Sequence, residues 1–268
     1  MKMNKWLYNE FKHCGVDYSK AGQADVYDEQ HQKFRNYETE FKGMMDFLGL
    51  HDTRNKTIID LGCGTGAISI FAADVFKTVY AVDVSDVMIE KAKKKIDKNI
   101  PNIRFVHAGF LSYDHDGDPA DLVVTKAAFH HLPDFWKQVA LLRMNRMLKM
   151  GGLLYMHDIV FQFDPQGYES KINAWISRFE EVAGEEFRLE VETHIREEYS
   201  TFGWILKEML EKAGFAVEKC RSADDFMTEY SCRKVNELNR DPFSGKKVHY
   251  TFGVLSVNRI DFMPRASS

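Results

Sequence analysis

Short apolar runs alternate with amphipathic segments through the middle of the chain. Runs typical of buried strands occur at 58–61, 79–82, 103–106, 121–125 and 153–158. Apolar residues at helical spacing predict helices between them, at 66–76, 86–98 and 135–149. Because strands alternate with helices, the pattern predicts an α/β fold, a doubly wound parallel sheet with helices on both faces.

The pattern changes on both sides of this region. Helical spacing over 24–48 predicts an N-terminal helical cap within residues 1–50, before the first strand. The acid-rich segment 161–200 predicts a helical insert after strand five, outside the sheet. A further helix is expected to begin with Ser200 or Thr201 as its cap and to end at Gly214.

Two more apolar runs follow this last helix. Residues 215–220 and 226–232 read as strands, which brings the predicted sheet to seven strands. The tail over 248–257 alternates like one more strand, but the pattern does not place it in the sheet. The chain from residue 51 to residue 268 is therefore taken as one domain that carries the insert.

Composition narrows the class of protein. The chain has 268 residues, of which 44% are hydrophobic and 28% charged, and a net charge of −4. A nucleic-acid-binding domain is usually basic, so no nucleic-acid partner is expected. No run approaches the roughly 20 apolar residues that span a membrane, and the first residues lack an apolar signal core. The sequence predicts a cytoplasmic protein without a membrane partner, and it leaves a homodimer open.

A glycine-rich turn joins the first strand to the first helix of the alternating region. Gly62, Gly64 and Gly66 follow Asp60 at every second position, with the small residue Cys63 between them. Glycines let a backbone turn tightly and approach a ligand closely. Dinucleotide-binding turns read G-x-G-x-x-G and hold a pyrophosphate, which Asp60 would repel. The spacing therefore disfavours a nicotinamide dehydrogenase, and the carboxylate suits a cationic group.

A second acidic residue ends the second strand. Asp83 precedes Val84 and Ser85, 17 positions after Gly66. A carboxylate at the end of this strand can accept hydrogen bonds from both hydroxyls of a ribose. Since Ser85 can cap the following helix, Asp83 remains available to a ligand.

These motifs together resemble the class I S-adenosylmethionine (SAM)-dependent methyltransferases. The glycine turn is similar to their motif D/E-x-G-x-G-x-G, residues 121–132 to their fourth strand with its His-His-Leu ending, and residues 148–152 to their "LKPGG" turn. The resemblance covers about residues 55–160 and is strongest to the small-molecule group of the ubiquinone and menaquinone biosynthesis type. It implies SAM as cofactor, S-adenosylhomocysteine as product, and an antiparallel hairpin of the last two strands at the edge of a mostly parallel sheet.

The resemblance also implies cofactor contacts. Asp83 and Val84 match the ribose-binding position, and Lys126 matches the methionine side of the site. Ala108, Gly109 and Phe110 stand where the family often has Gly-Asp-Ala, whose Asp faces the adenine amino group. That carboxylate is missing here, so the N–H and ring of Phe110 are the candidate adenine contacts.

Residues of the N-terminal cap complete the expected cofactor site. Tyr27 and Arg35 fall on the same helical face, through His31 at i, i+4 spacing, in the segment that covers the cofactor in many relatives. Either side chain could hold the SAM carboxylate. The cap and the insert are expected to form a lid over the substrate, and a purely structural or dimer surface is the alternative.

The reaction implied by the family is attack of a nucleophile on the methyl group of SAM. A general base is needed only if the nucleophile carries a proton of high pKa, and histidine is the usual one near neutral pH. His130 after strand four and His157 at the end of strand five are the candidates, whereas His131 is expected to pack structurally. The sequence shows no dense ligand motif such as H-E-x-x-H, so no metal is predicted.

The acceptor is predicted to be a small molecule. Residues 125–128 read Thr-Lys-Ala-Ala where enzymes that methylate base amines often carry N/D-P-P-Y/F. A lid rich in aromatic residues suits a small and partly apolar substrate. Two alternatives stay open: a protein or tRNA methyltransferase, which predicts an open charged groove, and a non-catalytic SAM-binding regulatory subunit.

Overall fold

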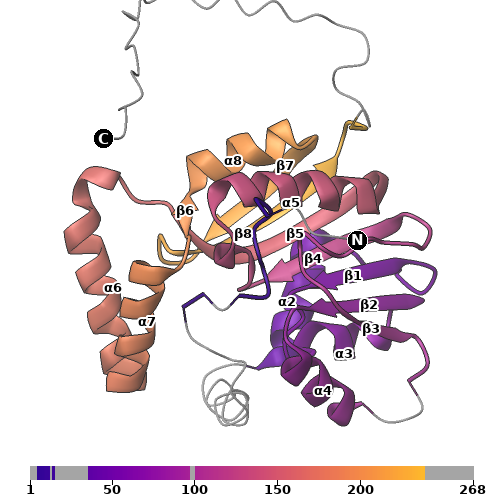
Figure 1. Ribbon diagram of the computed structural model, residues 1–268, viewed down its shortest axis with the longest axis horizontal. Coiled ribbons are helices and arrows are strands. Elements are labelled where there is room, and N and C mark those ends of the chain that lie inside the picture. The colour runs from indigo at the N-terminus through magenta and orange to yellow at the C-terminus, as the bar shows by residue number, and fades with distance from the viewer. Residues whose placement is uncertain (1–4, 13, 16–35, 97–99, 239–268) are drawn as a thin grey trace, which may run out of the picture. The chain divides into compact units, whose positions relative to one another are not determined.

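A mostly parallel sheet forms the centre of the computed structural model, which describes residues 5–12, 14–15, 36–96 and 100–238 (Figure 1). Its strands are β1 Thr57–Leu61, β2 Thr78–Asp83, β3 Ile103–His107, β4 Ala120–Lys126, β5 Leu148–Phe161, β6 Thr201–Phe202, β7 Phe215–Ser222 and β8 Met227–Lys234. The strand order is β3-β2-β1-β4-β5-β8-β7, and β6 pairs with β5 off this path. The order reverses between β1 and β4, as in a doubly wound sheet.

Strand directions follow the prediction. β1 is parallel to β2 and β4, and β5 is parallel to β4. β8 runs antiparallel to both β5 and β7 and so forms the predicted edge hairpin. The sheet has one strand more than predicted, because β5 extends past the sheet and its Val160 pairs with Thr201 of β6. A two-residue strand is too short to leave a pattern in the sequence.

The helices alternate with these strands. They are α2 Tyr37–Leu48, α3 Ala67–Ala73, α4 Asp86–Lys95, α5 Asp134–Met147, α6 Tyr168–Ala183, α7 Glu185–Glu197 and α8 Gly203–Lys212, with short 3-10 turns η1 Phe129–His131 and η2 Pro165–Gly167. Ser85 caps α4 by accepting a hydrogen bond from the Met88 N–H, as predicted. The predicted cap of α8 is wrong: its N-cap residue is Phe202, because Thr201 is taken up in β6 and the Ser200 hydroxyl bonds His194.

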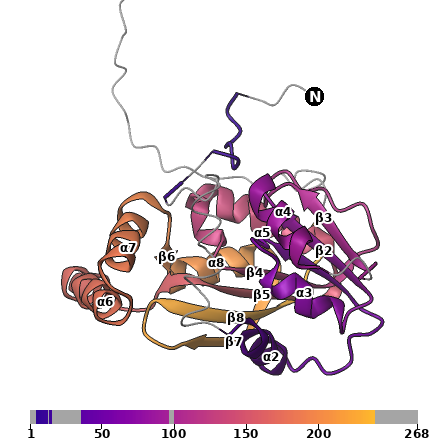
Figure 2. The same cartoon turned by 90° about the horizontal axis from the view of Figure 1, so that it is seen from below.

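Two apolar clusters hold helices against opposite faces of the sheet. On one face, α2 and α3 pack Phe41, Met44 and Ala72 against strand residues such as Ile58. On the other face, α5 and α8 pack against β1, β4 and β5. Figure 2 shows α2 below the strands and α5 above them. Helix α2 of the predicted cap thus covers a face of the sheet. Residues 24–35 and the tail over 248–257 lie outside the described residues.

The insert forms a helical hairpin outside the sheet, as predicted. α6 and α7 meet at Gly184, whose φ of 85° suits glycine. Trp175 of α6 stacks on Phe226, with ring centroids 4.3 Å apart, and Phe163 and Val191 belong to the same buried cluster. This cluster fastens the hairpin to the ends of β5 and β8. In the part of the chain that the structure describes, every helix is too short or too polar to cross a membrane. The division into cap, core and lid stays a prediction.

Candidate functional site

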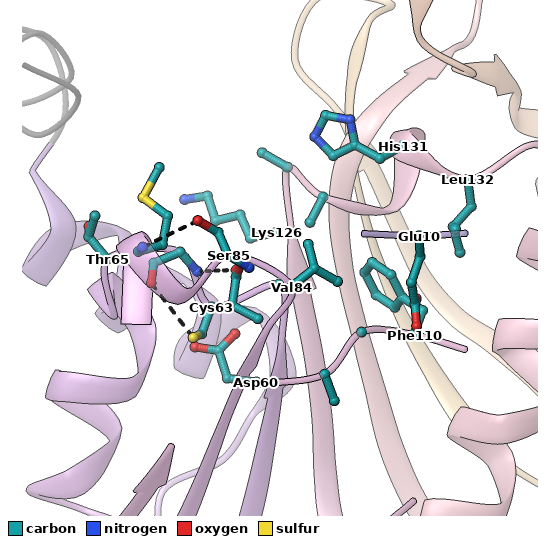
Figure 3. A pocket seen from close by; sticks show the side chains of 18 of the residues that line it. Glu10, Asp60, Cys63, Thr65, Val84, Ser85, Phe110, Lys126, His131 and Leu132 are labelled. Atoms are coloured by element: carbon teal, nitrogen blue, oxygen red, sulfur yellow. Dashed lines mark hydrogen bonds between the residues drawn. The ribbon is translucent and has the colours of Figure 1, made fainter. Parts of the chain in front are cut away.

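A cavity of about 280 Å³ opens at the carboxyl ends of the parallel strands (Figure 3). Open α/β sheets bind ligands at this edge, where the loops after neighbouring strands converge. Nine of the twelve residues predicted to bind the cofactor line this cavity: Asp60, Gly62, Cys63, Gly64, Asp83, Val84, Gly109, Phe110 and Lys126. Tyr27 and Arg35 lie outside the described residues.

The glycine turn forms one wall of the cavity. The N–H groups of Gly62 and Cys63 both donate to the carbonyl of Val82, which ties the turn to β2. Gly62 has a φ of 76°, and a Cβ there would lie 2.4 Å from the Cβ of Ala128. Gly66 caps α3 behind the turn and does not line the cavity. The turn therefore needs glycine at its start both for its backbone conformation and for its contact with the loop after β4.

Asp83 is held by two backbone donors. Its Oδ2 accepts from the N–H of Gly64 and its Oδ1 from the N–H of Ser85, each at 2.8 Å. Burial raises the pKa of this carboxyl, although the two backbone hydrogen bonds oppose the shift. A carboxylate oxygen accepts more than one hydrogen bond, so both oxygens keep capacity for a ligand.

Asp60 lies deeper, at the base of the turn. Its Oδ2 accepts a hydrogen bond from the Ser69 hydroxyl at 2.7 Å, and only 2% of the residue is exposed. Burial raises the pKa of Asp60 to about 7, against the effect of the Ser69 hydrogen bond, and the nearby Asp83 carboxylate adds to the rise. Ionised Asp60 would be stabilised by a cation in the cavity.

Glu10 enters the cavity from the N-terminal segment, and the sequence contained no signal for it. Its Oε2 accepts from the N–H of Leu111 at 2.9 Å. Its Oε1 is buried without a hydrogen-bond partner among the described residues. A Cβ on Gly109 would lie 2.4 Å from the Glu10 Oε2, so the absent side chain at 109 leaves room for this carboxylate. Figure 3 shows Glu10 beside Phe110.

Lys126 ends β4 and lines the cavity. Its Nζ lies 2.5 Å from the Glu40 Oε2 of α2, and both side chains are largely buried. This ion pair links the cavity wall to the helix on the sheet face. The ammonium group is thereby held near the turn, on the side where the resemblance expects the methionine part of SAM.

The histidines are arranged differently from the expectation. His131 lines the cavity, whereas His130 and His157 are not among the lining residues. Burial lowers the pKa of His131 to about 3 and that of His157 to about 4. Burial also lowers the pKa of His130, but the carboxylates of Asp158 and Glu198 outweigh it and raise the value to about 10. Adjacent residues of the tight turn η1 point in different directions, and the sequence does not show which one faces the cavity.

The N-terminal segment and the insert meet beside this wall. The Cys14 thiol lies 3.2 Å from the carbonyl of Glu197 at the end of α7. The N–H of Tyr199 donates to the carbonyl of His130, and the Tyr8 hydroxyl donates to that of His131. Both regions that the sequence predicted as a lid therefore contact the loop after β4.

Comparison with known proteins places the chain in a family. A profile described as a methyltransferase domain matches residues 58–152. A protein of Bacillus pumilus, named as an uncharacterized methyltransferase, is 30% identical over 217 residues, which cover 80% of this chain and 91% of that protein. The chain belongs to the class I SAM-dependent methyltransferases. This methyltransferase accordingly uses SAM as its cofactor.

Solved structures share the fold of this methyltransferase. A SAM-dependent methyltransferase from Aquifex aeolicus superposes with a TM-score of 0.55 at 16% identity, covering 81% of this chain and 99% of that one. The geranyl diphosphate C-methyltransferase from Streptomyces coelicolor A3(2), solved with Mg²⁺, geranyl diphosphate and S-adenosylhomocysteine, has a TM-score of 0.57 at 13% identity, covering 74% and 77%. At these identities the likeness shows the fold alone.

The residues of the cavity fit SAM. The glycine turn leaves a cradle without side chains beside Asp83, and that carboxylate keeps acceptor capacity. The buried Oε1 of Glu10 is an acceptor that lacks a donor among the described residues. SAM carries ribose hydroxyls and an adenine amino group that donate hydrogen bonds, so its polar groups complement these acceptors.

Proposed function

We propose that this methyltransferase acts on a small-molecule acceptor that binds next to SAM in a covered cavity. The observation that carries the proposal is the path of the N-terminal segment. Glu10 bonds the loop after β3, and Cys14 contacts the end of α7, so this segment crosses beside the cavity mouth. A covered site admits a small molecule more readily than a folded protein or a tRNA.

The proposal gives the cavity residues distinct roles toward SAM. Asp83 accepts hydrogen bonds from the ribose hydroxyls, with Val84 beside the sugar. The glycine turn lets the backbone approach the cofactor, and Asp60 and Lys126 face its methionine part. These positions agree with the family motif, and the cavity lining supports them.

Glu10 takes the place of the adenine-binding aspartate that this chain lacks. Gly109 stands at that aspartate's position in the motif and has no side chain to offer. The Glu10 carboxylate occupies the adjoining space, held by the Leu111 N–H through one oxygen. Its other oxygen accepts from the adenine amino group, while Phe110 packs against the ring.

Methyl transfer requires little from the protein beyond alignment of the acceptor with SAM and exclusion of water. The sulfonium of SAM is already activated, and orientation of two reactants contributes about 7–11 kcal/mol. The apolar side chains of Phe110 and Leu132 line the space beside the glycine turn and keep it dry. His130 and His157 lie outside this wall, so the proposal gives neither a contact with the acceptor.

Methyl transfer from tritium-labelled SAM into a cell extract tests the acceptor class. After incubation, the extract is separated by dialysis into small molecules and macromolecules. The expected result is a labelled dialysable product that chromatography separates from SAM, formed in smaller amount with the Asp83→Asn variant. Label that stays with protein or RNA would refute the small-molecule acceptor and favour the protein or tRNA alternative.

A further inference from the structure

We propose that His130, His131 and Glu198 bind one divalent transition-metal ion at the wall of the SAM cavity. The three residues come from two places far apart in the sequence: the turn η1 after β4 and the end of the insert after α7. Metal binding by these residues goes beyond the proposed function and does not depend on which acceptor the enzyme uses.

The spacing of the ligand atoms suits one ion. Each residue offers one nitrogen or oxygen atom, and these atoms all lie within 4.8 Å of one another. The Nε2 of His130 lies 3.2 Å from the Oε2 of Glu198. Two ligands about 2.0–2.1 Å from a tetrahedral zinc ion are about 3.4 Å apart, so these two atoms already have the separation of ligands.

Neighbouring side chains hold two of the ligands in place. The Oδ1 of Asp158 lies 2.5 Å from the Nδ1 of His130, which leaves the Nε2 pointing to Glu198. The Nδ1 of His194 contacts the Glu198 carboxylate, and its Nε2 lies 2.7 Å from the Ser200 hydroxyl. Metal-binding histidines and carboxylates are characteristically oriented by such partners.

His131 is the residue that distinguishes a metal site from a network of buried ion pairs alone. Ion pairs account for His130, His194, Asp158 and Glu198, which satisfy one another. His131 has no part in them, and its Nδ1 is buried without a hydrogen-bond partner among the described residues. An unpaired buried nitrogen is costly unless something binds it, and a metal ion would do so.

Charge also favours a divalent cation. Asp158 and Glu198 are both largely buried, and their carboxylates bring two negative charges beside His130 and His194. Protonation of both histidines would balance these charges only by placing two positive rings with centroids 4.8 Å apart, whereas one divalent ion bound by neutral imidazoles balances both. Two imidazole nitrogens with one carboxylate oxygen favour ions such as Zn²⁺ over Mg²⁺ or Ca²⁺, which prefer oxygen ligands.

Three protein ligands leave a coordination position open, and His131 lines the cavity. A role of the bound ion in catalysis, through this open position, rests on the proposed function. The open position takes a hydroxyl or thiol of the acceptor and lowers its pKa, so that its proton leaves to water. The oxygen or sulfur then attacks the methyl carbon, the bond from carbon to sulfonium breaks, and its electron pair stays on the sulfur of S-adenosylhomocysteine.

Calorimetric titration of the chelator-treated full-length protein with Zn²⁺ tests the site. We expect one ion per chain, with affinity reduced at least tenfold in Glu198→Gln and in His131→Ala. Glu197→Gln is the matched control, because Glu197 is adjacent but has a side chain that is 47% exposed and bonds Arg196. Its affinity for Zn²⁺ should equal that of the unchanged protein.

The thermal unfolding transition of each sample, followed by circular dichroism, shows whether each variant is folded. If Glu198→Gln does not fold, His131→Ala decides, since His131 makes no ion pair in the described part of the chain. Absence of Zn²⁺ binding by the unchanged protein, or equal affinity in a folded His131→Ala, overturns the metal site. Zn²⁺ binding that follows the prediction without methylation of any small molecule overturns only the proposed function.

Discussion

Replacement of Glu10 by glutamine isolates the proposed adenine contact with the smallest change in shape. The Leu111 N–H needs an acceptor, so the amide oxygen of the new side chain would take the place of Oε2. The amide nitrogen would then take the place of the buried Oε1 and direct a donor at the donating adenine amino group. The variant should bind S-adenosylhomocysteine more weakly because an attractive contact becomes a repulsive one.

The size of the effect follows from the burial of this contact. Oε1 is shielded from water and has no partner within the described residues, so nothing else among them compensates for the lost bond. A hydrogen bond to a charged group contributes about 1.5–3 kcal/mol. Since 1.4 kcal/mol corresponds to a tenfold change, the dissociation constant should rise about 10- to 150-fold.

Calorimetry with two ligands makes the assay specific. S-inosylhomocysteine carries a carbonyl oxygen in place of the adenine amino group. The unchanged protein should prefer S-adenosylhomocysteine, and Glu10→Gln should narrow or invert this preference, because the amide nitrogen can donate to the carbonyl. Glu90→Gln, on the exposed surface of α4, is the control and should keep the original ratio.

The ratio of the two affinities decides the outcome. A general loss of structure in Glu10→Gln would weaken both ligands equally and leave the ratio unchanged. An unchanged ratio in a folded Glu10→Gln would refute the proposal that Glu10 contacts the adenine amino group.

Three further predictions concern the glycine turn and its two acids. Asp83→Asn should weaken SAM binding about 10- to 150-fold by loss of charge-assisted hydrogen bonds to the ribose, whereas calorimetry should find exposed Asp86→Asn unchanged. Gly62→Ala should lower the free energy of unfolding by about 1–3 kcal/mol more than Gly151→Ala. Both glycines have a φ of 76°, but of the two only Gly62 has a close neighbour at its Cβ position. Equal losses of free energy in urea denaturation would count against a steric cause. Because burial raises the pKa of Asp60 to about 7, the folded state binds that proton more tightly than the unfolded state, and stability falls as pH rises from about 4 to 7. Asp60→Asn should remove this loss, so its free energy of unfolding should rise relative to that of the unchanged protein between pH 5 and pH 8. A difference in free energy of unfolding that stays constant over this range would contradict the raised pKa of Asp60.

Much of the fold could be predicted because it is encoded locally. The alternation of apolar runs with helical spacing marks each strand and helix between 57 and 161, and the glycines mark the turn that needs positive φ. Ser85 is another local signal: a serine before an amphipathic run predicted the cap of α4. Each of these signals involves residues within a few positions of one another.

The site was only partly predictable, because its other half depends on contacts between distant segments. Glu10 reaches a backbone N–H that lies 101 positions further along the chain. Glu198 meets His130 across the insert, and no spacing rule connects them. The sequence therefore predicted the glycine turn and its acids at the cavity wall. It did not predict Glu10 as the proposed adenine contact, or the group formed by His130, His131 and Glu198 beside the cavity.

The sequence by itself determined the α/β class, the order of strands and helices, and the glycine turn with its two acids, since local conformational preferences and hydrophobic periodicity specify these. Only the tertiary structure decided that His131 and not His130 faces the cavity, that β6 extends the sheet, and that Glu10 fills the space beside Gly109. The physical reason is that side-chain direction and long-range pairing are selected by packing. Packing depends on all segments that meet at a point, whereas periodicity describes one segment at a time.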